Sequence, residues 1–148
     1  MSDLLSGRDY VVAVAIATEV PPTPTGEFTG DMIPLAMRAV CDVIRNRVAD
    51  SRFPKTPVEV VLQRNQFSAV CQQDYWRKAM AGTWFPEHVA RCLDAWREPI
   101  WPHYNARMLW YFSPVSMIPP NSAPTWAAGR TEALIPGIDR HYFRWFTD

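Results

Sequence analysis

Fourteen prolines in 148 residues constrain this chain more than any other feature of its sequence. Proline has no backbone N–H and a fixed φ angle, so it ends helices and interrupts strands. Their number predicts short helices joined by ordered loops rather than long regular elements. The strongest helix signals cover residues 10–19 and 32–48, and the single proline among them, Pro34, falls in a first turn, where proline is tolerated.

Residues 10–19, with the sequence YVVAVAIATE, are an apolar helix signal that ends in an acid. Asp9 is placed to cap this helix, and a proline pair follows Glu19 closely and ends it. Val12, Ile16 and Glu19 recur at helical spacing and share one face. Apolar surroundings disfavour the charged form of a carboxyl group, which suits a general acid near neutral pH. The alternative is a helix-end Glu that turns into solvent.

The best helix signal covers residues 32–48, with Asp31 as its predicted cap. We interpret it as the central core helix, with Arg38 and Asp42 paired on its outer face. Asn46 and Arg47 are expected to tie its end to neighbouring loops. The predicted apolar stripe consists of Ile33, Met37, Val40, Ile44 and Val48.

Shorter elements follow. Thr56 and Glu59 form a capping box at the start of a helix that is predicted to end near residue 64. Further helices are predicted at 72–80 and 86–96. Residues 108–112 predict a buried strand, and 133–146 a second strand that pairs with it. The expected fold is mainly α (α+β), a central helix surrounded by short helices, with a small hairpin or sheet from the C-terminal third. No boundary divides residues 1–148, so we expect a single domain.

Charge and composition argue against some kinds of partner and favour others. Fifteen basic and fifteen acidic residues give no net charge, which argues against nucleic acid and anionic membranes as partners. An aromatic content of 13% fits a neutral polar ligand such as a glycan, although core packing is the commoner explanation. We find no secretory signal and no membrane span, and therefore expect synthesis in the cytoplasm.

The three cysteines, Cys41, Cys71 and Cys92, match no zinc or redox motif and are expected to be reduced, buried thiols. His88 lies four residues before Cys92, but no second ligand pair stands nearby in sequence. No metal and no cofactor are therefore expected.

Four blocks resemble the spore-cortex-lytic (SleB-type) cell wall hydrolases. The first is the apolar helix ending at Glu19, followed by a loop with Glu27. The second is the helix end at 39–48, AVCDVIRNRV. The third is 53–61, FPKTPVEVV, which leads into Gln66, Phe67 and Ser68. The fourth is the tail, with aromatic motifs at 111–112, 124–126 and 141–143.

The resemblance implies a lysozyme-like fold and cleavage of peptidoglycan glycan strands between N-acetylmuramic acid and N-acetylglucosamine, typically as a lytic transglycosylase. The family's essential acid falls on Glu19. Its second acid falls on Glu27, eight positions later instead of the usual four. A wall enzyme without a secretory signal resembles a phage or prophage lysin or a part of a gene-transfer particle. We therefore expect action on the wall or periplasm, after holin-dependent delivery or within a virion-like particle.

By the same resemblance, Gln66 and Ser68 would face the glycan, Phe67 would pack behind them, and Tyr111 would approach the cleft. Loop bonding and core packing are the structural alternatives for these residues. If the enzyme hydrolyses its substrate instead, Glu27 or Asp31 is the candidate base.

Two rival functions stay open on sequence grounds. One is a Cys-His amidase or peptidase that uses Cys71 or Cys92 with a histidine. The other is a glycan-binding or structural virion protein without activity. His141 and Trp126 are expected to be structural.

Overall fold

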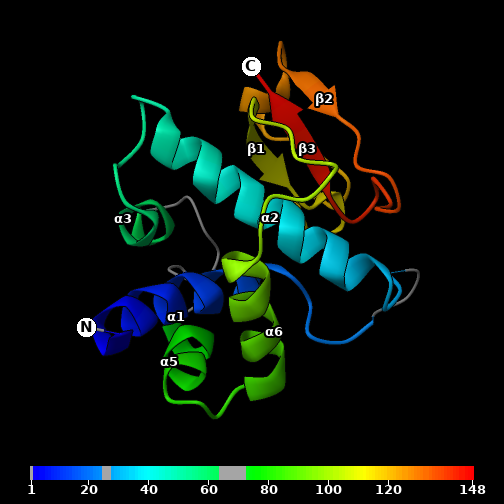
Figure 1. Cartoon of the computed structure of the whole chain (residues 1–148). Coiled ribbons are helices and arrows are strands. Elements are labelled where there is room, and N and C mark those ends of the chain that lie inside the picture. Colours follow the sequence, from blue (N-terminus) through cyan, green and yellow to red (C-terminus); the bar gives the residue numbers. More distant parts are fainter. Residues whose placement is uncertain (1, 25–27, 64–72) are drawn as a thin grey trace.

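The computed structural model describes residues 2–24, 28–63 and 73–148 (Figure 1). The main elements are α1 (Ser2–Glu19), α2 (Met32–Ala49), α3 (Pro57–Leu62), α5 (Gln73–Met80), α6 (Pro86–Arg97), β1 (Met108–Phe112), β2 (Thr131–Ala133) and β3 (Arg144–Thr147). Helix α2 runs through the middle, with the sheet on one side and α1, α5 and α6 on the other. This arrangement confirms the predicted α+β class, with a central helix, short helices and a small C-terminal sheet.

The stretch of α1 from Val12 to Ala17 is apolar on every side of the helix and is buried accordingly. Residues 12–17 are each at most 1% exposed, and α1 packs mainly against α6. The helix begins at Ser2, so the prediction that Asp9 caps it is wrong. Asp9 lies inside the helix, where its carboxylate accepts hydrogen bonds from Trp96 Nε1 (3.2 Å) and Arg97 Nε (3.1 Å) of α6.

Helix α2 spans nearly the predicted range, but its polar residues differ from expectation. Asp31 precedes the helix without a side-chain cap bond. The predicted Arg38–Asp42 surface pair is wrong: Arg38 forms an ion pair with Glu98, whereas Asp42 is 1% exposed. Asp42 Oδ2 accepts a hydrogen bond from Trp101 Nε1 at 2.5 Å. The loop after α6 supplies the partner of Arg38, whereas Asp42 forms its ion pair with Arg45 of the same helix, at 3.7 Å.

Burial raises the pKa of Asp42 from its ordinary 3.8 to about 6, against the opposing effects of the Trp101 bond and of the nearby arginines. Because the folded state binds this proton more tightly than the unfolded state, the stabilisation is complete below pH 4 and is lost between about pH 4 and 6. A shift of this size corresponds to roughly 3 kcal/mol. We expect the wild type to be more stable relative to Asp42→Asn at pH 4 than at pH 7, and the difference between their free energies of unfolding to fall by this amount over that range. Urea unfolding of both proteins from pH 4 to 7 measures it, and a constant difference would contradict the assignment.

The shorter helices follow their local signals. The predicted Thr56 cap is confirmed, since Glu59 N donates to Thr56 Oγ1 (3.2 Å); the Glu59 carboxylate accepts from the Thr56 hydroxyl (2.8 Å) rather than from the backbone N–H of a regular capping box. Helix α3 ends at Leu62, α5 covers the predicted range closely, and α6 extends one residue beyond it.

The sheet is antiparallel with the strand order β1-β3-β2. Its last strand in sequence is therefore central, as Figure 1 shows. The predicted pairing with 108–112 is confirmed, but the region predicted as one strand contains parts of two, β2 and β3, and the loop between them. Gly137 in this loop has φ +89°, a backbone conformation that other residues rarely adopt, so the turn favours glycine at this position.

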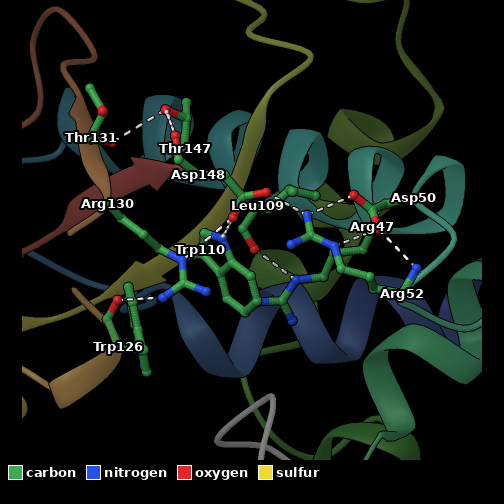
Figure 2. Close-up of polar contacts among 10 residues, drawn as sticks. All are labelled: Arg47, Asp50, Arg52, Leu109, Trp110, Trp126, Arg130, Thr131, Thr147 and Asp148. Carbon is green, nitrogen blue, oxygen red and sulfur yellow. Dashed lines mark hydrogen bonds and ion pairs between the residues drawn. The ribbon is translucent and has the colours of Figure 1, made fainter. Parts of the chain in front are cut away.

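Arginine and tryptophan side chains pack where α2 meets the sheet (Figure 2). The guanidinium carbons of Arg130, Arg47 and Arg52 lie 4.2, 5.6 and 5.9 Å from the ring centre of Trp110. Trp126 packs against Trp110 and against two phenylalanines of the sheet. The expectation that Trp126 is a packing residue is confirmed.

Candidate active site

A cleft of about 550 Å³ opens at the C-terminal end of α1. Its walls come from α1 and the proline loop that follows, from the end of β1 with residues 113–117, and from the loop before β3. The side chains that line it are mostly apolar or aromatic, with a few polar groups among them. They include Thr18, Glu19, Phe28, Trp84, Tyr111, Ser113, Ser116, Met117, Tyr142 and Phe143.

Glu19 is the last residue of α1 and lines this cleft. Its side chain is neither buried nor fully exposed. The six residues before Thr18 are in the core, so the helix that carries Glu19 is fixed on all sides. An acid on a rigid element at the edge of a cleft is well placed to meet a bound substrate.

Tyr111 of β1 also lines the cleft, and its phenol interacts with Glu19. Burial, above all, raises the pKa of Tyr111 well above its ordinary 10, and the charge of Glu19 and a hydrogen bond with it raise it further. The phenol therefore stays protonated beside the Glu19 carboxylate. The Tyr111 ring packs on Trp145 of β3, with 5.1 Å between ring centres. The acid on the helix and the phenol on the sheet are thus held as a pair.

A buried cation lies close to this pair. Arg47 of α2 is 3% exposed, and its Nε donates to the Leu109 carbonyl oxygen at 2.9 Å, as Figure 2 shows. Burial lowers the pKa of Arg47, while Tyr111 and Glu19 oppose this effect. The guanidinium positive charge therefore attracts the Glu19 carboxylate from the core side of the cleft.

A histidine forms hydrogen bonds with two backbone carbonyl groups, one in the last turn of α1 and one directly after the helix. His88 of α6 is 2% exposed, and its Nε2 lies 3.0 Å from the Ala17 oxygen and 2.8 Å from the Val20 oxygen. Burial lowers the pKa of His88, more than its two carbonyl contacts raise it. The neutral ring thus donates its Nε2–H to both oxygens.

The structure brings together two of the six predicted site residues, Glu19 and Tyr111. The others, Glu27, Gln66, Phe67 and Ser68, lie outside the described residues. Asp31, the alternative base, is exposed and does not line the cleft.

The residues of the rival Cys-His interpretation have other surroundings. Cys41 and Cys92 are buried free thiols, and burial raises the pKa of both, that of Cys41 to about 12. A high pKa disfavours the thiolate that a cysteine enzyme needs. Cys71 lies outside the described residues, and His141 is exposed against the edge of the Tyr142 ring. Within the described ranges, no group of three or more His, Cys, Asp or Glu residues is placed to bind a metal ion.

Sequence reasoning missed four residues of the site. The sequence suggested only a structural role for Arg47. It suggested no role in the site for His88, Trp84 or Tyr142. Each lies at least 28 positions from Glu19, so no helical or strand periodicity connects them. The one signal that could have indicated a contact such as that of His88 was the proline pair after Glu19. Proline has no N–H, so these residues leave carbonyl groups of the helix without a donor.

A protein-family model described as Cell Wall Hydrolase matches residues 34–144, more than half of the chain. No curated protein and no solved structure gives a significant match. The matched range includes Arg47, Trp84, His88, Tyr111 and Tyr142 but begins after Glu19. None of the helices in the described ranges is long and apolar enough to cross a membrane.

Proposed function

This chain belongs to the Cell Wall Hydrolase family, and from that premise we propose that it cleaves peptidoglycan glycan strands between N-acetylmuramic acid and N-acetylglucosamine. The observation that carries the proposal is the position of Glu19. Its carboxyl group lines a cleft of about 550 Å³ and pairs with the Tyr111 phenol. Trp84 and Tyr142 add aromatic rings to the cleft wall, and such rings pack well against the apolar faces of sugars.

We propose that the reaction is a lytic transglycosylation. Glycoside hydrolysis normally requires two carboxyl groups. Among the described residues that line the cleft, Glu19 is the only carboxylate. A transglycosylase needs no second one, because the C6 hydroxyl of muramic acid is the nucleophile and no water has to be activated.

Glu19 alone both gives and takes back the proton in this reaction. The Glu19 carboxyl donates its proton to the glycosidic oxygen as the bond from that oxygen to the muramic acid C1 breaks. The C6 hydroxyl of the same sugar then bonds to C1, which forms a 1,6-anhydro ring. The Glu19 carboxylate accepts the hydroxyl proton and is ready for the next cycle. Arg47 and Tyr111 would stabilise the carboxylate between the two steps.

Further substrate contacts complete the proposal. Glu27, Gln66, Phe67 and Ser68 stay predicted substrate-binding residues on the strength of their motifs.

Residues 1–148 are proposed to form one catalytic domain. In support, a single cluster of buried side chains extends from Val12 in α1 to Trp145 in β3.

Product analysis tests the proposal. Purified peptidoglycan is digested with the protein, and the soluble muropeptides are weighed by mass spectrometry. We expect 1,6-anhydromuramic ends, which are lighter by one water than reducing ends. Reducing ends would mean hydrolysis, and free stem peptides from intact glycan would mean an amidase or peptidase. Binding to insoluble peptidoglycan without soluble fragments would mean that the protein is not an enzyme.

A further inference from the structure

We infer that His88 is the positioning residue for Glu19: it caps the end of α1 from the neighbouring helix and so fixes the direction of the acid. The inference rests on the proposed role of Glu19 in glycan cleavage. It concerns a residue that the motifs do not single out and that does not line the cleft.

The sequence leaves the end of α1 without its usual donors. In a regular α-helix the carbonyl of residue i accepts from the N–H of residue i+4. For Ala17 this residue is Pro21, and for Thr18 it is Pro22, and neither has an N–H. The last regular bond in this part of the chain is from Val20 N to Ile16 O, at 3.1 Å.

His88 supplies the missing donor. Its Nε2 lies within hydrogen-bond distance of the oxygens of Ala17 and Val20, at 3.0 and 2.8 Å. A buried carbonyl without a donor costs roughly 1–3 kcal/mol, so the ring stabilises a turn that the two prolines would otherwise weaken. Nδ1 is buried without a hydrogen-bond partner among the described residues, which disfavours a second ring proton.

The two carbonyls lie on either side of Glu19. Fixing the oxygens of Ala17 and Val20 therefore fixes the backbone before and after the acid. Trp84, which lines the cleft, lies edge-on to the His88 ring, with 6.2 Å between ring centres. The histidine thus connects the helix end to the wall of the cleft. A displacement of a catalytic group by about 1 Å can lower the rate roughly 10²-fold, so this support matters for catalysis.

Three substitutions at His88 separate a positioning role from a general structural one. Gln places an amide N–H near the position of Nε2, Asn is too short to reach the carbonyls, and Leu has no donor. We expect His88→Leu and His88→Asn to lower kcat per folded molecule at least about tenfold with KM within about twofold, because only the reacting geometry changes. His88→Gln should recover most of the lost kcat. Val89→Ala is the matched control, since Val89 is also buried in α6 but has no polar contact with α1.

The readouts are kcat and KM on purified peptidoglycan, Tm, and hydrogen exchange of the amides of residues 18–20. Faster exchange and lower kcat in His88→Leu, with kcat unchanged in Val89→Ala, support the inference. An unchanged kcat in folded His88→Leu overturns it, as does an equal kcat loss in Val89→Ala at an equal loss of Tm. If the wild type releases no glycan fragments, the proposed function fails instead. The exchange measurement then still decides whether His88 fixes the end of α1, and unchanged exchange in His88→Leu overturns the inference.

Discussion

Glu19→Gln is expected to lower the rate of glycan cleavage by about 10³-fold, within the range that general acid–base catalysis contributes. The amide has the size of the carboxyl group but cannot give a proton to the glycosidic oxygen or take one from the C6 hydroxyl. The amide fits beside the Tyr111 phenol in the same space, so the shape of the cleft should change little. The measurement is the loss of turbidity of a peptidoglycan suspension, together with mass analysis of the soluble products.

Glu87→Gln is the matched control for this experiment. Glu87 is exposed in the first turn of α6, so the same chemical change there should leave the rate within about twofold. Circular dichroism of both variants establishes that they are folded. Undiminished clearing by folded Glu19→Gln would remove this residue from the mechanism, and a loss in both variants would point to a charge effect rather than to a catalytic role.

Asn46→Ala is expected to produce the largest loss of stability, about 3–5 kcal/mol. Asn46 is 4% exposed, and its Nδ2 donates to the carbonyls of Asn105 (2.7 Å) and Met108 (2.8 Å). Its Oδ1 accepts from the Tyr104 hydroxyl. Alanine would leave two carbonyls without this donor and one hydroxyl without its acceptor, at roughly 1–3 kcal/mol for each group that is fully buried. These bonds connect α2 to the start of β1, so the sheet would lose part of its attachment to the central helix and keep the Arg47 bond to Leu109.

Tyr104→Phe is the graded control for Asn46. It removes one of the three hydrogen bonds and keeps the two bonds to the carbonyls, so a loss of about 1 kcal/mol is expected. Urea unfolding followed by tryptophan fluorescence measures both variants. Equal losses in the two variants, or a loss below about 1 kcal/mol in Asn46→Ala, would show that the amide does not hold the strand to the helix.

Local features of the sequence predicted most of the fold. The apolar stripe of α2, the Thr56 cap of α3 and the apolar run of β1 each depend on residues within one turn or one strand. The start of α1 was missed because Asp9 resembles a cap, whereas tertiary contacts with Trp96 and Arg97 place it inside the helix. The strand range at 133–146 merged two strands because neither β2 nor β3 is longer than four residues.

The site was harder to predict because its contacts join distant segments. Glu19 was identified by its place at the end of an apolar helix, and Tyr111 by resemblance. The bonds from His88 to Ala17 and from Trp101 to Asp42 span 71 and 59 positions. No periodicity encodes such pairs, since they depend on how α1 and α2 pack against the segments that follow them. The pairing of Arg38 was wrong for the same reason, as Glu98 is 60 residues away.

The central place of β3 in the sheet has a consequence for synthesis on the ribosome. Neither β1 nor β2 has its partner until residues 144–147 have left the exit tunnel. Tyr111 also lacks the Trp145 ring that supports it until then. A nascent chain therefore contains Glu19 long before residues 144–147 complete the part of the cleft that the sheet forms. Glycan cleavage should therefore appear abruptly once residues 144–147 can fold, and polypeptides released before residue 144 should be inactive.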